Sequence, residues 1–158
     1  MTALKSLFFF ILVPGLLMGY FPYLISTTDT ELFVPGVLGW LAFPLWFVGW
    51  TVMIWCFWIF TANGRGTPAP VDPPSELVVR GPYRFVRNPM YAAGIIALFG
   101  WILWSPSLPL IVAPFVFFLA AHLFVKFYEE PTLKKKFGAA YDEYVERAPR
   151  WIPKLRNR

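Results

Sequence analysis

Long apolar segments without a charged residue constrain this chain more than any other feature. Residues Val37 to Thr61 contain no Lys, Arg, Asp or Glu, and neither do residues Asn88 to Leu123. The apolar share of 58% exceeds the roughly half that is usual for a soluble domain. Because a helix needs about 20 apolar residues to cross a hydrocarbon core of about 30 Å, the pattern predicts an all-α integral membrane protein.

The apolar pattern predicts about four transmembrane helices in one membrane domain, 1–158. The expected spans are about 4–25, 37–61, 89–104 and 109–128, followed by a short cytoplasmic amphipathic helix at about 139–147. The first span exceeds the roughly 7–15 residues of a signal-peptide core, so we expect it to be retained. Pro14-Gly15 should kink it. The third span rises only roughly 24 Å, so either the bilayer thins or the helix begins inside protein.

The basic residues indicate the topology. Of the fourteen Lys and Arg residues, four lie in the middle loop 63–88 and nine follow Val125, whereas the loops 26–31 and 105–109 have none. The positive-inside rule then predicts cytoplasmic termini and a cytoplasmic middle loop, here in the inner membrane of a prokaryote. The net charge of +5 is attributed to the membrane surface and not to nucleic acid. A monomer or weak homo-oligomer is expected.

The middle loop begins with a stretch dense in Gly and Pro, at 63–75, which predicts an irregular segment. The single Cys56 excludes a disulfide framework within the chain and a cysteine metal cluster, and no metal site is expected.

Glu129 and Glu130 form a carboxylate pair near the end of the fourth span. In one interpretation they are solvated, and Lys126 and Lys134 pair with Glu130 along one helix face. In the other they form a site for an ammonium or sulfonium cation, because an uncompensated carboxylate is costly to bury. Spacing alone leaves both interpretations open.

Arg84 and Arg87 precede Asn88-Pro89, which reads as an N-cap followed by the first residue of a helix. The arginines are typical interface anchors. Alternatively, they join the free N–H groups of the helix start in binding an anion.

Three further residues are candidates outside these two groups. His122, the only histidine, lies two turns before Glu130 and is either packed in the bundle or functional. Arg147 and Arg150 either contact lipid headgroups or fold back onto the site. Residues 151–158, WIPKLRNR, are expected to be an interface anchor.

Two segments carry a resemblance to a known family. Residues 81–94, GPYRFVRNPMYAAG, are similar to the G-x-Y-x-x-x-R-H-P-x-Y-x-G motif of the isoprenylcysteine carboxyl methyltransferases and their phospholipid (phosphatidylethanolamine) methyltransferase relatives. Residues 128–153, YEEPTLKKKFGAAYDEYVERAPRWIP, resemble the E-E-x-x-L-x-x-x-F-G-x-x-Y-x-x-Y-x-x-R-x-P motif of the same family. The resemblance covers about the C-terminal half.

The resemblance implies an integral membrane enzyme that uses S-adenosyl-L-methionine and releases S-adenosyl-L-homocysteine. The residues that it assigns to the cofactor pocket are Arg87, Asn88, Pro89, Tyr91, Gly94, Glu129 and Glu130. Arg147 matches the arginine before the terminal proline. Asn88 stands where the motif usually has His, and it cannot titrate near neutral pH.

We expect methyl transfer to a membrane-soluble acceptor, either a lipid or a prenyl-type carboxylate or amine. A carboxylate acceptor needs only a cationic holder, for which Arg147 and Arg84 are candidates, whereas an amine or thiol must lose a proton, for which His122 or a Glu could serve. One alternative acceptor is a small hydrophobic thiol or quinone-like molecule. Another possibility is a non-enzymatic four-helix membrane scaffold or transporter.

Two expectations follow for variants. Glu129→Gln and Glu130→Gln should both lower cofactor affinity without unfolding the protein, and Asn88→His should be tolerated.

Overall fold

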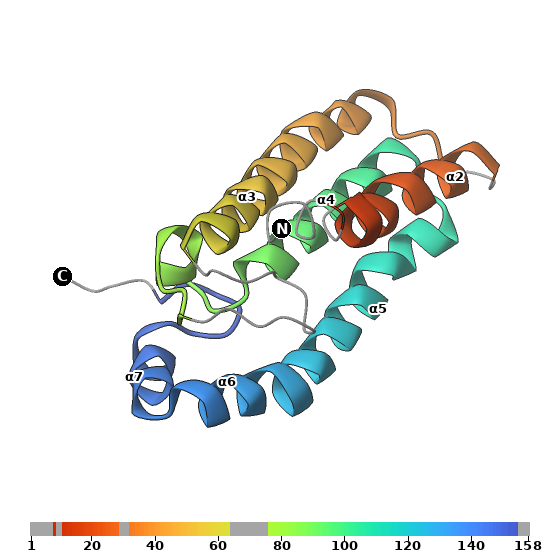
Figure 1. The fold of residues 1–158 in the computed structure, drawn as a ribbon. Helices are drawn as coiled ribbons and strands as arrows, with labels where there is room; N and C mark the ends of the chain where they lie inside the picture. Colours follow the sequence, from red (N-terminus) through yellow and green to blue (C-terminus); the bar gives the residue numbers. More distant parts are fainter. Residues whose placement is uncertain (1–7, 9–10, 29–31, 64–75, 155–158) are drawn as a thin grey trace.

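The computed structural model describes residues 8, 11–28, 32–63 and 76–154, and residues 61–63 only in their backbone. Every regular element in these ranges is a helix (Figure 1). In chain order they are η1 (Ile11–Tyr20), α2 (Phe21–Thr28), η2 (Gly36–Leu41), α3 (Ala42–Asn63), η3 (Gly81–Arg84), α4 (Pro89–Trp104), α5 (Leu108–Phe124), η4 (Val125–Glu129), α6 (Glu130–Phe137) and α7 (Ala139–Arg147). Of the irregular segment expected at 63–75, Asn63 is instead the last residue of α3, and residues 64–75, like the beginning of the first span, lie outside the described residues.

The expected all-α membrane architecture is confirmed. Three helical stretches are long and apolar enough to cross a membrane: Ile11–Thr28, Gly36–Phe60 and Leu108–Phe137. α4 is shorter, with 16 residues, and it begins and ends where the sequence predicts. The last stretch runs on through α6 to Phe137, and it ends at Gly138, whose φ of +53° favours glycine.

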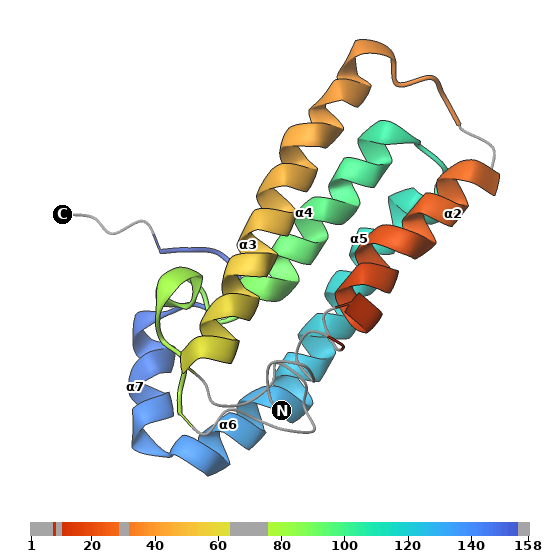
Figure 2. The ribbon, with the colours of Figure 1, turned by 45° about the horizontal axis from the view of Figure 1, so that its top comes forward.

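α3 and α4 lie side by side, and α2 lies along α5 (Figure 2). The contact between α3 and α4 is very close at Gly49, which has no side chain. A Cβ there would lie only 2.9 Å from the carbonyl oxygen of Ala93 and 3.1 Å from Cβ of Ala97. Small residues at a crossing point let two membrane helices pack backbone against backbone. Larger side chains from α3 and α4, together with Met18, then form the buried core next to this crossing.

The first span contains two prolines, and the structure accommodates both. Around Pro14, where the sequence predicts a kink, η1 is a π-helix, a form that usually occurs in short pieces. Pro22 has no N–H to donate to the carbonyl of Met18 four residues earlier. The indole Nε1 of Trp101 on α4 donates to that carbonyl instead, at 2.8 Å. A side chain from another helix thus replaces the missing backbone donor.

Replacing Trp101 with Phe is expected to destabilise the protein by about 1 kcal/mol, because the Met18 carbonyl loses its indole donor within the bundle. Unfolding in detergent, followed by circular dichroism against denaturant, would measure this loss. Trp58→Phe is the matched control, since Trp58 is 70% exposed on α3. Equal stability of the two variants would show that the Trp101 hydrogen bond contributes nothing.

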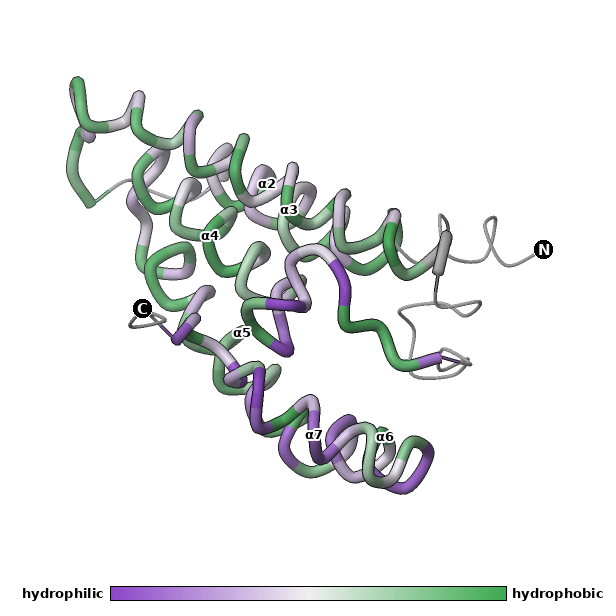
Figure 3. Tube along the Cα trace, turned by 90° about the vertical axis from the view of Figure 1, so that its left-hand side faces the viewer, coloured by the Kyte–Doolittle hydropathy of each residue, from purple (hydrophilic) through white to green (hydrophobic). Residues whose placement is uncertain are grey.

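Polar residues gather at one end of the bundle. Figure 3 shows hydrophilic segments in α6, α7 and the chain before α4, whereas α3, α4 and α5 are mainly hydrophobic. At the opposite end, the backbone N–H of Leu32 donates to the carbonyl of Pro106 at 2.8 Å and joins the two connections there. The candidate site residues at 84–91 and 129–150 therefore lie near the polar end.

Candidate functional site

Two segments about forty residues apart in the sequence meet at this end. Arg87 Nη2 lies 3.3 Å from Glu130 Oε1, and the Tyr91 hydroxyl donates to Glu129 Oε2 at 3.3 Å. The start of α4 and the end of the fourth span are thus in direct contact. This is the juxtaposition that the two sequence motifs predict.

The two carboxylates point to different partners. Glu129 is the last residue of η4, a π-helix, and Glu130 is the first residue of α6. The helix therefore changes from π-helical to α-helical geometry between the two glutamates. Glu129 lines a cavity between the helices, whereas Glu130 faces Arg87 and Arg150. π-Helical turns are frequent at functional sites because they change which side chains face inward.

Glu130 is held between two arginines. Arg150 Nε and Nη2 donate to Glu130 Oε1 and Oε2 at 2.8 and 2.7 Å, a bidentate pair. The hydrogen bonds to Glu130 raise the pKa of Arg150 above its ordinary value. The side chains of Arg87 and Glu130 are only 11% and 18% exposed. Glu130 is therefore paired mainly with two arginines and not with solvent. We call this charged network, Arg87–Glu130–Arg150, the arginine clamp.

The interpretation in which Glu130 pairs with Lys126 and Lys134 is wrong for Lys134, whose Nζ lies 2.9 Å from Asp142 Oδ1 on α7. Lys126 Nζ lies 5.1 Å from the ring centroid of Phe127. Arginines outcompete these lysines because their planar fork matches both oxygens of the carboxylate.

Asn88 occupies the N-cap position of α4, but its side chain makes no capping hydrogen bond. Instead, its Nδ2 donates to the carbonyl oxygen of Arg150 at 3.2 Å. The neighbouring backbone N–H of Arg87 donates to the carbonyl of Pro149 at 2.9 Å. Asn88, which is 7% exposed, therefore fastens the C-terminal segment to the start of α4.

The inner cavity, of about 110 Å³, lies between η1, α3, α4 and α5. Its polar lining residues are Tyr83, Arg87, Asn88, Tyr91 and Glu129, and its apolar ones include Leu17, Met18, Met53, Met90 and Phe117. Arg87 Nε is buried and has no hydrogen-bond partner among the described residues. The inner cavity is thus lined by one carboxylate, Glu129, and one guanidinium group, Arg87.

Pro89 and Gly94 are buried beside the cavity without lining it. A Cβ on Gly94 would lie 3.1 Å from Cε of Met18 and 3.4 Å from Cε of Met53, two residues of the cavity wall. Gly94 therefore gives these methionines room, and Pro89 sets the start of the helix. Both residues affect the cavity indirectly, through the residues that line it.

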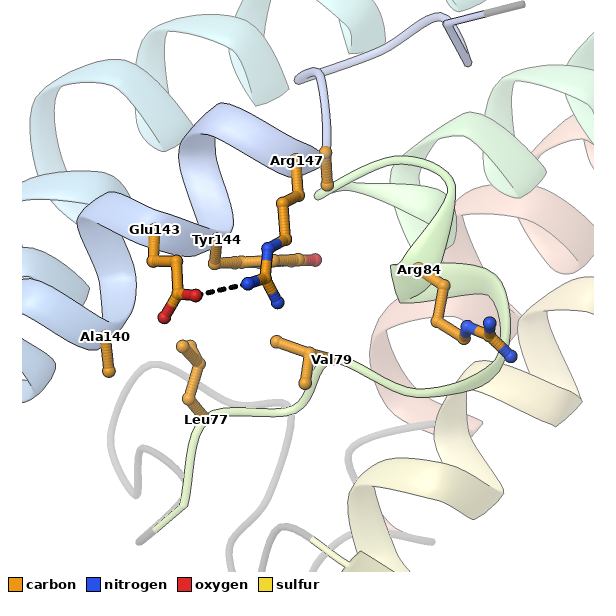
Figure 4. Close-up of a pocket in the computed structure, with 8 residues that line it drawn as sticks. Leu77, Val79, Arg84, Ala140, Glu143, Tyr144 and Arg147 are labelled. Carbon is orange, nitrogen blue, oxygen red and sulfur yellow. Dashed lines mark hydrogen bonds and ion pairs between the residues drawn. The ribbon is translucent and has the colours of Figure 1, made fainter. Parts of the chain in front are cut away.

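Arg84 and Arg147 line a second, larger cavity of about 860 Å³ between α7 and the chain before α4 (Figure 4). We call it the outer cavity. Arg147 forms an ion pair with Glu143 on its own helix, four residues earlier. The buried hydroxyl of Tyr144, which also lines the outer cavity, donates to the carbonyl of Tyr83 at 2.7 Å. Since Tyr83 lines the inner cavity, this bond connects the walls of the two cavities.

Burial raises the pKa of Tyr144 above its ordinary value, so this phenol keeps the proton that it donates to Tyr83. Burial also raises the pKa of Tyr141 to about 12, and the Glu130 charge acts in the same direction. Both tyrosines therefore remain neutral over the physiological pH range.

In the part of the chain that the structure describes, His122 lines neither the inner nor the outer cavity. Its Nδ1 accepts a hydrogen bond from Trp151 Nε1 at 3.2 Å, and the two rings are stacked with an interplanar angle of 25°. Residues 151–158 are expected from the sequence to form an interface anchor, and Trp151, which is half-buried, also packs against Phe118, His122 and Tyr91.

Sequence reasoning missed Trp151 and left Arg150 open, because neither the spacing nor the charge pattern indicates their partners. Trp151 contacts His122 across 29 residues, and Asn88 contacts Arg150 across 62. Only the fold brings such residues together. The one available signal was Arg150 itself, a basic residue directly after the Arg147-Ala148-Pro149 segment that resembles the family motif.

The comparison with protein families identifies the family of the chain. The sequence model of the phospholipid methyltransferase family matches residues 37–140, more than half of the chain, and this region contains the start of α4 and both glutamates. No curated protein matches the chain significantly. The family and the apolar helices together indicate a methyltransferase that is integral to a membrane. The chain belongs to the phospholipid methyltransferase family.

Proposed function

We propose that this protein transfers a methyl group from S-adenosyl-L-methionine to a membrane-soluble acceptor at the cytoplasmic face of the membrane. The observation that carries the proposal is the inner cavity, which both Glu129 and Arg87 line. The donor has a sulfonium, an ammonium and a carboxylate, so it needs a carboxylate and a cation close together. The wall supplies both.

The charged residues that line the inner cavity suit S-adenosyl-L-methionine. Glu129 would hold a cationic group, and Arg87 would donate to the carboxylate beside the first turn of α4, between Asn88 and Tyr91. The cavity is smaller than the roughly 300–1,000 Å³ of typical ligand sites. A whole donor therefore requires it to widen. Met18, Met53 and Met90 in its wall can change shape at low cost, since methionine side chains are unbranched and flexible.

The acceptor is proposed to reach the cavity sideways from the lipid, past Leu17 and Phe117, which form part of its apolar wall. When bound, the donor supplies an electrophilic methyl group, which the acceptor nucleophile takes as the carbon–sulfur bond breaks and the sulfur keeps the electron pair. The protein's task is alignment, which can lower a barrier by roughly 7–11 kcal/mol. Burial between helices also excludes water from the reacting groups.

Arg147 is proposed to hold an anionic group of the acceptor from the outer cavity, which lies against the inner one at Tyr83 and Tyr144. Arg84 also lines this cavity, and its guanidinium, which points away from Arg147 in Figure 4, would join after a change of rotamer. A carboxylate or phosphate there would be bound by charge and need no base. Arg84→Gln and Arg147→Gln should then raise the KM for the acceptor and leave donor affinity unchanged. A fall in donor affinity in both variants would place the donor in the outer cavity instead.

The proposal is tested by titrating purified protein in detergent with S-adenosyl-L-homocysteine, and by following transfer of a labelled methyl group into a total lipid extract. We expect binding and a labelled lipid product. Label found only in a small thiol or quinone-like molecule would favour the alternative acceptor. No binding of either donor or product would leave a scaffold or transporter.

Asn88→His is expected to keep donor affinity within about threefold, because an imidazole N–H can donate to the Arg150 carbonyl as Asn88 Nδ2 does. The measurement is the same titration, with Asn88→Leu as the matched variant that cannot donate. If the His variant loses binding as fully as the Leu variant, the amide of Asn88 has a role that an imidazole cannot fill.

A further inference from the structure

Residues Pro149–Trp151, which we call the C-terminal strap, cross the start of α4 and reach α5. The strap is fixed by the Arg87 N–H to the Pro149 carbonyl at 2.9 Å and by Asn88 Nδ2 to the Arg150 carbonyl at 3.2 Å. The bidentate pair of Arg150 with Glu130 fixes its middle. These bonds place the Trp151 side chain against Tyr91 on α4 and Phe118 on α5.

The half-buried Trp151 ring contacts aromatic residues of both helices. Its centroid lies 5.1 Å from that of Phe118 and 6.1 Å from that of His122 on α5, and 6.4 Å from that of Tyr91 on α4. The contact with Tyr91 is edge-on, with an interplanar angle of 62°. Such ring pairs contribute about 0.5–1.5 kcal/mol beyond their buried area. Trp151 is thus a wedge whose position sets how Tyr91 lies.

The hydrogen bond from Trp151 defines the state of His122. An indole N–H can only donate, so His122 Nδ1 must accept, and in neutral His122 the proton is on Nε2. Nδ1 is therefore occupied, and the ring faces Trp151 and Phe118. This geometry does not present His122 Nδ1 to an acceptor as a general base.

We propose that His122 and Trp151 are positioning residues for the donor site, acting through Tyr91 on Glu129. His122 fixes the indole, the indole packs against the Tyr91 ring, and the Tyr91 hydroxyl donates to Glu129 at 3.3 Å. The inference rests on the proposed function, because it takes Glu129 as the carboxylate that holds the donor. It replaces the catalytic role expected for His122 with an indirect one.

The test compares His122→Asn with His122→Leu. The Asn oxygen lies close to where Nδ1 was and can accept from the indole, whereas Leu cannot. We expect His122→Leu and Trp151→Phe each to weaken S-adenosyl-L-homocysteine binding by about tenfold, the effect of one neutral hydrogen bond. His122→Asn should stay within about twofold of the wild type, and His122→Leu with Trp151→Phe should be no worse than either alone.

Affinity is measured far below the unfolding temperature of each variant, so that a purely structural role would lower stability but not affinity. Trp151→Phe keeps the wedge and tests the inference even if His122→Leu does not fold. Loss of turnover in both His122 variants with unchanged affinity would make His122 a base and overturn the inference. Unchanged affinity in His122→Leu and Trp151→Phe would overturn it as well.

A second readout separates this inference from the proposed function. Trypsin cleavage after Arg150, followed by mass spectrometry without any ligand, should be faster in His122→Leu than in His122→Asn, because the strap loses its anchor at Trp151. A wild type that binds no donor would overturn the proposed function, and with it the role in positioning. Equal cleavage in all variants would refute the strap anchor itself.

Discussion

Glu129→Gln is expected to lower the affinity for S-adenosyl-L-methionine by about 10- to 100-fold. A charged hydrogen-bond partner contributes about 1.5–3 kcal/mol, and Glu129 is the carboxylate in the wall of the inner cavity. The fold should survive, because the Tyr91 hydroxyl can donate to the amide oxygen of Gln as it does to Glu129. Calorimetric titration in detergent measures the affinity.

Titrating the product alongside the donor sharpens this experiment. If Glu129 faces the sulfonium, Glu129→Gln should weaken the donor far more than S-adenosyl-L-homocysteine, whose sulfur is uncharged. If Glu129 faces the ammonium, both should weaken equally. Glu146→Gln, at an exposed carboxylate on α7, is the matched control and should change neither affinity. Unchanged donor affinity in Glu129→Gln would falsify the cation site.

Glu130→Gln is expected to reduce the free energy of unfolding by about 2 kcal/mol, which differs from the expectation drawn from the sequence. The change leaves Arg87 and Arg150 facing each other across a neutral side chain at a site that is mostly buried. Breaking a fully buried pair costs about 3–5 kcal/mol and an exposed one about 0–1. The intermediate exposure of the arginine clamp sets an intermediate cost.

Denaturant unfolding in detergent measures this loss. Asp142→Asn is the control, because the Lys134–Asp142 pair is 65% and 54% exposed and should contribute less than 1 kcal/mol. Equal stabilities of the two variants would mean that the arginine clamp does not hold the strap to the bundle. Glu129→Gln should be more stable than Glu130→Gln, since only the latter disrupts an ion pair.

The sequence predicted the helices well because their signals are local. Uncharged apolar runs, the Asn88-Pro89 helix start and Gly138 as a helix end require no knowledge of the partner segments, and α4 and α7 have the bounds that the pattern indicates. The two motifs also indicated which segments meet. The start of α4 does contact the di-glutamate.

The sequence could not predict that Glu129 lines the inner cavity while the adjacent Glu130 pairs with arginines. This difference depends on the π-helical turn Val125–Glu129, and nothing in the letters VKFYE distinguishes that turn from an α-helical one. The strap was also hidden, since Trp151 near a chain end reads equally well as an interface anchor. The contacts that place Trp151, with Tyr91, Phe118 and His122, come from helices far away in the sequence.

The central claim is that the donor binds in the inner cavity between the start of α4 and Glu129. The most direct test uses a photoreactive S-adenosyl-L-methionine analogue with its reactive group at the sulfonium end, followed by peptide mapping. We expect label on the peptides that contain Asn88–Tyr91 and Glu129, suppressed by excess S-adenosyl-L-homocysteine. Label confined to residues 139–148 of α7 and its end, in the outer cavity, would contradict the account.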